Sequence, residues 1–170
     1  MSDPRRERTI RWDDPALIPA AARRMPGLEL IRAMERGEVP APIAVTMLGI
    51  GFDLIEPGHV IMHLDPDETH YNAIGSVHGG VLTTLLDTAI GLSIHATLPL
   101  GRSYTTLDIA VRFIKAVRID QGRMLADATV IHSGRSTAIG RATVRNAAGV
   151  LYATAESTCL LFDTPAARGT

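Results

Sequence analysis

The alternation of hydrophobic and polar residues is clearest in the carboxyl-terminal half of the chain, where it predicts four β-strands. The first of them, residues 105–117, places Leu107 and Ile109 on one face and Thr106 and Asp108 on the other. Short turn clusters separate it from three more predicted strands, over residues 123–132, 136–145 and 150–161. Turns this short favour an antiparallel meander.

The amino-terminal half of the chain predicts two helices and a hairpin. Apolar residues at helical spacing indicate a short helix over residues 27–36 and a long one from Gly79 to about Thr97. Between them the pattern is strand-like from Ile43 through Ile55, turns, and resumes over residues 60–64. The order of elements predicts an α+β domain in which one apolar helix packs against one antiparallel sheet. We divide the chain into a helical extension (1–40), this domain (41–163) and a tail (164–170).

The predicted long helix carries unusually little charge. From Tyr71 to Gly101 the only formally charged side chain is Asp87, and no cation stands three or four residues away from it to pair with it. The face of the helix opposite the sheet would normally be solvated and charged. We therefore expect a second subunit to approach that face.

Composition excludes several classes of protein. The chain has 170 residues, 46% of them hydrophobic, and a net charge of −1, which predicts one globular domain without nucleic acid as a partner. With the single cysteine Cys159 and no apolar leader, we expect a reducing, cytoplasmic location; Asp87 argues against a membrane span over residues 81–100. The histidines have no metal-ligand spacing, so neither a metal nor another cofactor is expected. A serine hydrolase is excluded because no G-x-S-x-G occurs.

Candidate chemistry lies where the uncharged segment enters the long helix. The run from Asn72 to Gly80 ends in His78-Gly79-Gly80, and Asp87 follows nine residues after His78. The start of a helix leaves unpaired N–H groups that can hold an oxyanion, and a carboxylate can activate water. These are the two requirements for transferring an acyl group to water.

The motif N-x-x-G-x-x-H-G-G followed by L-L-D-T-A, from Asn72 to Ala89, resembles the hot-dog-fold acyl-CoA thioesterases of the phenylacetic-acid-pathway (PaaI-like) type. The resemblance covers residues 48–162 and implies a long helix wrapped by an antiparallel sheet. It implies hydrolysis of acyl-CoA to free acid and CoA, with Asp87 as general base or nucleophile and the Gly79 N–H polarising the thioester carbonyl. It also implies a homo-oligomer, a dimer or a tetramer built from dimers, with each active site at a subunit interface.

Three further residues receive roles from the resemblance. The Asn72 side chain would help to position the carbonyl or the water, His78 would shape the turn, and the Thr106 hydroxyl would orient the water, with Thr105 as its competitor. Ordinary structural roles stay open: Asn72 as a turn former, His78 as a structural histidine and Thr106 as a strand residue.

Coenzyme A needs cations or N–H donors at the mouth of its pocket. The best candidate is the predicted turn that contains His132, Gly134, Arg135 and Ser136, with Arg102 and Arg112 as weaker choices.

The acyl group is not identified by the sequence. We expect Ile90, Ile94 and the partner's helix to wall its pocket, which favours a medium or aromatic acyl group over acetyl. Two alternatives within the same fold are a non-catalytic acyl-CoA binder and a dehydratase or hydratase. Replacement of Asp87 separates enzyme from binder, and product analysis separates the two reactions.

Overall fold

The structure is a computed structural model that describes residues 5–164. It contains four α-helices, two short 3-10 turns and six strands in those residues, and the predicted tail lies outside them except for Thr164. The helices are α1 (Leu17–Ala22), α2 (Gly27–Glu35), α3 (Ile43–Met47) and α4 (Gly79–His95), and the 3-10 turns are Glu68–His70 and Ile119–Gln121. The strands are β1 (Ile50–Glu56), β2 (His59–Leu64), β3 (Arg102–Phe113), β4 (Met124–Ser133), β5 (Thr137–Asn146) and β6 (Leu151–Asp163).

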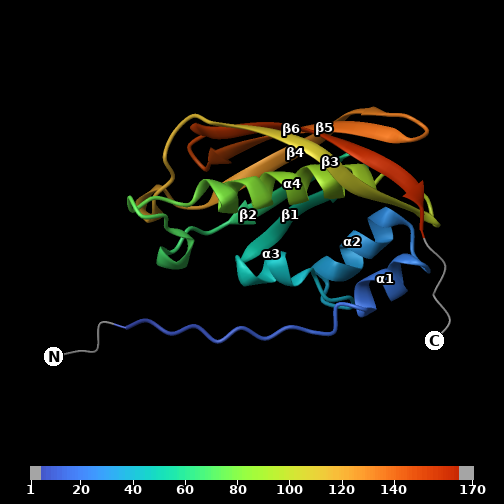
Figure 1. The fold of residues 1–170 in the computed structure, drawn as a ribbon, viewed down its shortest axis with the longest axis horizontal. Coiled ribbons are helices and arrows are strands. Elements are labelled where there is room, and N and C mark those ends of the chain that lie inside the picture. Colours follow the sequence, from blue (N-terminus) through green and yellow to red (C-terminus); the bar gives the residue numbers. More distant parts are fainter. Residues whose placement is uncertain (1–4, 165–170) are drawn as a thin grey trace.

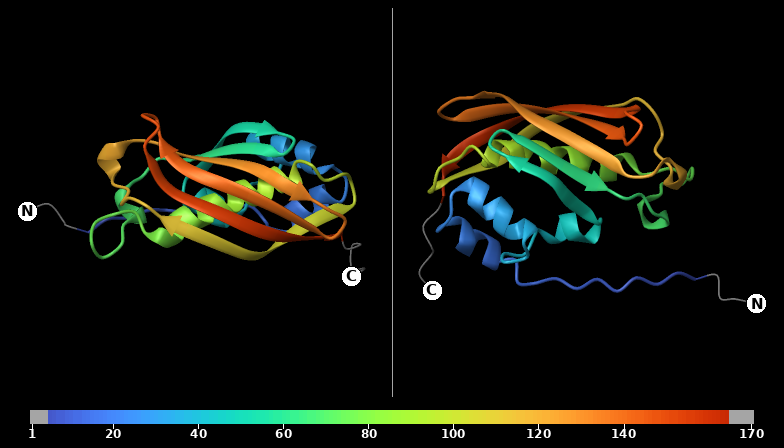
Figure 2. Two further views of the ribbon diagram at one scale, coloured as in Figure 1. Left: turned by 90° about the horizontal axis from the view of Figure 1, so that it is seen from above. Right: turned by 180° about the vertical axis from the view of Figure 1, so that it is seen from behind.

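All six strands form one antiparallel sheet in the order β1-β2-β4-β5-β6-β3. The sheet lies over one side of the long helix α4, while α1, α2 and α3 lie on the other side (Figures 1 and 2). One face of α4 is fully buried against the sheet, with Leu85, Leu86, Ile90 and Ile94 each 0% exposed. This is the hot-dog fold, so the predicted fold class is confirmed.

The predicted meander is only partly correct. Strands β4, β5 and β6 are consecutive neighbours, as their short turns predict, but β3 pairs with β6 and not with β4. Residues 114–123, which join β3 to β4, are too long and irregular for a tight hairpin, and this lets the chain cross to the far side of β6. Strand β3 is therefore an edge strand of the sheet.

The strand predicted from Ile43 is wrong at its beginning. Residues 43–47 form helix α3, which starts after Pro42 and buries Val45 against the core. Gly49 then adopts a positive φ of 66°, a conformation that glycine takes readily, and it turns the chain into β1. Over so few residues the apolar positions fit the period of a helix as well as that of a strand. The flanking proline and glycine favour the helix.

A β-bulge in β3 changes which residues share a face. The register of β3 against β6 shifts between Thr106 and Asp108, so one residue is added and the alternation reverses there. Leu107 is 58% exposed, contrary to the predicted inward face, and Thr106 turns toward α4 together with Ile109. The bulge thus aims a hydroxyl at the helix.

The amino-terminal helices pack as a small unit beside the main core. Their buried cluster consists of Ala21, Leu30, Ala33, Met34 and Val39. Helix α2 also packs on the end of α4, where Gly27 lies against the His95 carbonyl, and the Gly27 N–H donates to the carbonyl of Leu98, just beyond the helix, at 3.1 Å. Among residues 5–164, no helix has the length and apolarity needed to cross a membrane.

Candidate functional site

Asp87 lies halfway along α4 and faces a cavity instead of the sheet. Its Oδ1 accepts a hydrogen bond from the Thr106 hydroxyl at 2.9 Å, and it forms no ion pair with any of residues 5–164. The neighbouring hydroxyls of Thr84 and Thr88 donate to carbonyls one turn earlier in the helix, so they do not compete for this carboxylate. An unpaired carboxylate with one hydroxyl donor is a suitable base for a water molecule.

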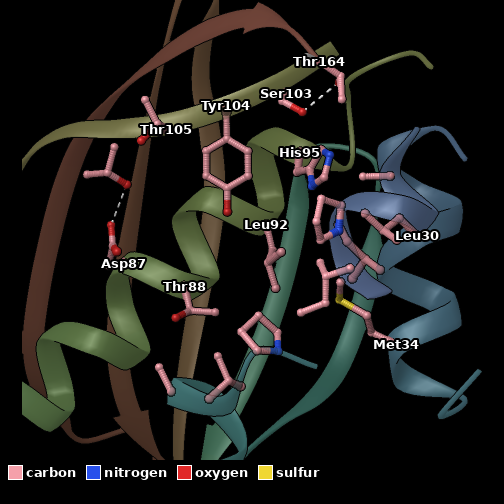
Figure 3. A pocket seen from close by; sticks show the side chains of 18 of the residues that line it. Leu30, Met34, Asp87, Thr88, Leu92, His95, Ser103, Tyr104, Thr105 and Thr164 are labelled. Carbon is pink, nitrogen blue, oxygen red and sulfur yellow. Dashed lines mark hydrogen bonds between the residues drawn. The ribbon is translucent and has the colours of Figure 1, made fainter. Parts of the chain in front are cut away.

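The cavity at Asp87, called the Asp87 cavity below, has a volume of about 940 Å³. Figure 3 shows Asp87, Thr88, Leu92 and His95 of α4 along one wall and α2 on the other side. Thr105 and Thr106 both line it, but only Thr106 bonds to Asp87. Of the two residues considered, Thr106 is thus the one next to the carboxylate.

The predicted oxyanion donor lies at a second cavity. Gly79 and Asn72 border a space of about 330 Å³ together with Phe113 and Lys115. Gly79 is the first residue of α4, and its N–H has no hydrogen-bond acceptor among residues 5–164. An unpaired N–H at a helix start is the group that a developing oxyanion requires.

Within one chain, Gly79 and Asp87 are too far apart to act on the same carbonyl. Eight residues of helix separate them, which is about 12 Å along the axis at the usual rise per residue. A base and an oxyanion donor must both lie within about 3 Å of the reacting atoms. A site that uses both groups therefore needs Gly79 of one copy and Asp87 of another.

The Asn72 side chain shapes its own loop. Its Oδ1 accepts from the N–H groups of Ile74 and Ser76, at 3.0 and 3.2 Å, and its Nδ2 donates to the Ser76 hydroxyl. His78 caps α4, with Nδ1 accepting from the Gly80 N–H at 2.9 Å and the ring exposed. Both residues hold the backbone around Gly79, which is the role predicted for His78 and the structural alternative for Asn72.

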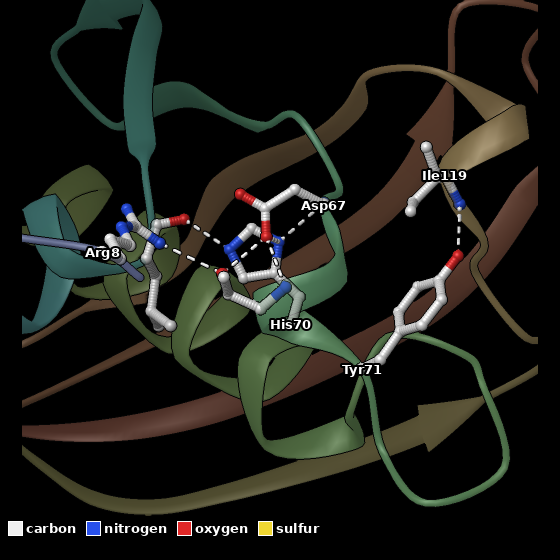
Figure 4. A network of polar contacts seen from close by, with 7 residues as sticks. Arg8, Asp67, His70, Tyr71 and Ile119 are labelled. Carbon is white, nitrogen blue, oxygen red and sulfur yellow. Dashed lines mark hydrogen bonds and ion pairs between the residues drawn. The ribbon is translucent and has the colours of Figure 1, made fainter. Parts of the chain in front are cut away.

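A buried histidine anchors the loop that presents these groups (Figure 4). His70 is 2% exposed; its Nδ1 accepts from the Asp67 N–H, which leaves Nε2 to donate to the Leu48 carbonyl at 3.0 Å. The His70 carbonyl in turn accepts from the His78 N–H at 2.7 Å. No sequence pattern predicts this role, because His70 has no motif of its own.

We expect His70→Phe to lower the free energy of unfolding by about 2–4 kcal/mol, because it leaves the Leu48 carbonyl and the Asp67 N–H, which both bond to the buried His70 ring, without these partners. Urea denaturation measures the change. His132→Phe is the control, since His132 is exposed and should shift stability by less than about 0.5 kcal/mol. Equal small effects of the two substitutions would contradict the anchoring role.

The four residues predicted to bind coenzyme A stay together on the β4–β5 turn. His132, Gly134, Arg135 and Ser136 are all exposed, and the Arg135 carbonyl accepts from Arg102 at 2.7 Å. This turn lies beside the start of β3, whereas Gly79 lies beside its end, at Phe113. The cation that shares a cavity with Gly79 and Asn72 is Lys115, which the sequence analysis missed although it is the only lysine.

The predicted pocket walls are wrong in one respect. Ile90 and Ile94 are 0% exposed and pack into the core; Ile90 fills the space that a side chain at Gly140 would need. The α4 residues that do line the Asp87 cavity, Thr88, Leu92 and His95, lie on the other side of the helix. Tyr104 and residues of the helices α1, α2 and α3 are also among the walls, and the sequence pattern pointed to none of them.

Cys159 offers a rival nucleophile because it pairs with Thr106 across β3 and β6. Its side chain is fully buried, and burial raises the pKa of the thiol. The thiolate is the reactive form of cysteine, so this environment disfavours attack by sulfur. Asp87 is the better-placed group.

The chain is similar to several known proteins. The model of the thioesterase superfamily matches residues 74–153. Human acyl-coenzyme A thioesterase 13 is 28% identical over 92 residues, a match that spans 54% of this chain and 64% of that protein. A phenylacetic-acid-degradation-related protein of Ralstonia eutropha superposes with a TM-score of 0.69 at 27% identity, over 76% of this chain and 97% of that chain.

A third similar structure holds a ligand. It is a Streptococcus mutans protein bound to acetyl-CoA, with 29% identity and a TM-score of 0.62 over 67% of this chain and 89% of that chain. Fold and site define a hot-dog protein with a helix-borne carboxylate. Over residues 74–153 the chain thus resembles the thioesterase superfamily, and it is similar to these individual proteins.

Proposed function

We propose that this protein hydrolyses acyl-CoA thioesters to free acid and CoA. The observation that carries the proposal is Asp87, an unpaired carboxylate hydrogen-bonded to Thr106 and open to a large cavity. The similarity to an acyl-coenzyme A thioesterase and to a protein that binds acetyl-CoA supports CoA as the carrier.

In the proposed reaction, the thioester carbonyl lies between Asp87 of one subunit and the helix start of another. Asp87 takes a proton from water, or attacks the carbonyl itself, while Thr106 holds the carboxylate in place. The Gly79 N–H of the other subunit stabilises the oxyanion as the carbonyl carbon becomes tetrahedral. The C–S bond then breaks, and the proton that Asp87 took from water passes to the sulfur, so that CoA leaves as the thiol and the water oxygen stays in the acid. If Asp87 attacks directly, the C–S bond breaks as an anhydride with Asp87 forms; water then cleaves the anhydride, giving the acid, the free carboxylate and the proton for the thiol. His78 caps the helix start at Gly80, and Asn72 holds the loop before it.

Two features of the chain support a homodimer. Strand β3 pairs on one side only, which leaves a twelve-residue edge that a second copy can extend. The α4 residues outside the core carry no formal charge except Asp87, which is the pattern expected for a helix covered by a partner. A two-fold arrangement would give each dimer two complete sites.

Thiol release from a panel of acyl-CoA thioesters tests the function. We expect steady release of free CoA from at least one member, with the acid as the second product identified by mass spectrometry. A change in unsaturation without thiol release would indicate a dehydratase or hydratase. Binding of the panel without either product would leave a non-catalytic binder and would overturn the proposed hydrolysis.

A further inference from the structure

The Asp87 cavity reaches far beyond the carboxylate. It follows α4 from Asp87 past Leu92 to His95, about 12 Å along the helix axis. The wall facing these residues belongs to the amino-terminal helices, with Ile18 and Ala22 from α1 and Leu30 and Met34 from α2. Its volume of about 940 Å³ is far more than an acetyl group occupies.

The helices α1 and α2 form a fixed wall. Leu30 and Met34 belong to the buried cluster of these helices. Gly27 packs so tightly on the end of α4 that a Cβ built there would lie 1.8 Å from the His95 carbonyl oxygen. This close approach, together with the hydrogen bond from Gly27 to Leu98, sets the width of the cavity.

Several polar side chains line the cavity, among them Arg23, Thr88 and Ser103, and two of them, Tyr104 and His95, lie next to each other. Tyr104 points into the cavity between Asp87 and His95 (Figure 3), and the Tyr104 and His95 rings lie 5.3 Å apart. Neither the Tyr104 hydroxyl nor the His95 ring forms a hydrogen bond with any of residues 5–164. Both residues are partly exposed and line the cavity, so these two groups are available to a ligand.

Both groups are uncharged at neutral pH. Burial raises the pKa of the Tyr104 hydroxyl well above its ordinary value and lowers the pKa of the His95 imidazole. A neutral hydroxyl and a neutral imidazole can each donate and accept one hydrogen bond. They therefore suit an uncharged oxygen atom better than a carboxylate or phosphate.

We propose that the Asp87 cavity binds an extended acyl group, with α1 and α2 as its far wall, and that Tyr104 and His95 bind an oxygen atom carried by that group. The inference rests on the proposed function, because Asp87 fixes where the thioester lies. Gly91, which the Tyr104 hydroxyl covers, and His95 lie about 6 and 12 Å from Asp87 along α4. The substrate class is thus a medium-chain acyl thioester with a hydroxyl or keto oxygen at that distance from the carbonyl.

The preference of the enzyme for long over short acyl groups tests whether α1 forms part of the far wall of the acyl pocket. Ala22→Phe places a ring in the cavity from α1, and we expect the ratio of kcat/KM for octanoyl-CoA to that for acetyl-CoA to fall about tenfold or more. Ala20→Phe is the matched control, because Ala20 lies on the same helix but does not line the cavity, and it should keep the wild-type ratio. An unchanged ratio in Ala22→Phe, or an equal fall in the control, would overturn the assignment of the wall.

Oxygen recognition is tested with a matched pair of substrates, octanoyl-CoA and its ω-hydroxy derivative. We expect Tyr104→Phe to lower the preference for the hydroxylated substrate about tenfold, the value of one lost hydrogen bond. Its midpoint of thermal unfolding should stay at the wild-type value, since the hydroxyl has no hydrogen-bond partner among residues 5–164. Tyr152→Phe is the control, because that hydroxyl accepts from Asn146 at 3.4 Å and lies outside the cavity, so the preference should not change.

Calorimetric binding of free octanoate and ω-hydroxyoctanoate distinguishes failure of this inference from failure of the proposed function. Suppose that the wild type hydrolyses no thioester but binds ω-hydroxyoctanoate more tightly than octanoate, and that Tyr104→Phe removes this difference. The proposed oxygen recognition is then supported, and the proposed hydrolysis is wrong. If thioesters are hydrolysed but Tyr104→Phe leaves the preference for the hydroxylated substrate unchanged, the proposed oxygen recognition is wrong and the proposed hydrolysis is supported.

Discussion

Asp87→Asn should lower kcat for thioester hydrolysis by about 10²–10⁴-fold, the contribution expected of a positioned base or nucleophile. The substitution is nearly isosteric, and the amide oxygen can still accept the hydrogen bond from the Thr106 hydroxyl. Stability should therefore change by less than about 1 kcal/mol. Thiol release under saturating substrate, together with thermal unfolding of both proteins, measures the two quantities.

Asp120→Asn is the matched control for this prediction. Asp120 is an exposed aspartate in the 3-10 turn between β3 and β4, so the same chemical change there should leave kcat at the wild-type value. If Asp87→Asn kept its activity within tenfold of the wild type while folded, another group would have to activate the water. The central role given to Asp87 would then be wrong.

The parts of the fold that could be predicted are those in which local pattern and turn chemistry agree. Strands β4, β5 and β6 alternate cleanly between short turns, and α4 has a long apolar stripe that ends near a proline and a glycine. The bulge at Leu107 could not be predicted, because a regular alternation continues on both sides of it. The pairing of β3 with β6 depends on contacts between residues about 50 apart in the sequence, which no local pattern records.

The residues of the candidate site also fall into those that the sequence could predict and those that it could not. Asp87 stands out in the sequence because it is the only formal charge in a long uncharged run, and Gly79 because it opens the helix. Their partners come from elsewhere in the fold: Thr106 reaches Asp87 only through the bulge, and α2 reaches the cavity only through its packing on the end of α4. Ile90 was predicted to line the pocket but is buried in the core. Helical periodicity identifies an apolar face of the helix, but it does not show whether a sheet or a cavity lies against that face.

Gly79→Pro should lower kcat by about 10²–10³-fold, the usual cost of removing one oxyanion donor. Proline is suited to the first position of a helix, and the preceding His78 already has φ −61° and ψ 135°, a conformation that proline permits in its neighbour. The substitution thus removes an N–H that has no acceptor in the part of the chain that the structure describes, and it leaves the helix intact.

Gly79→Ala separates the lost donor from the added bulk. It keeps the N–H, while its Cβ would meet the exposed Phe113 ring at 3.0 Å, as the proline ring would. We expect alanine to reduce kcat less than tenfold. Equal losses in the alanine and proline variants would assign the effect to Phe113 and remove the N–H from the mechanism.

Mixing the two inactive proteins tests whether one site combines groups from two chains. After joint unfolding and refolding of Asp87→Asn with Gly79→Pro, random pairing makes half of the dimers mixed, and each mixed dimer has one site with both groups intact. Activity should therefore return to roughly a quarter of the wild-type value in a two-fold dimer. If Asp87 and Gly79 of one site came from the same chain, every site would keep one defect, and mixing would restore no activity. Because Gly79 and Asp87 of one chain lie about 12 Å apart along α4, we expect the mixture to recover activity.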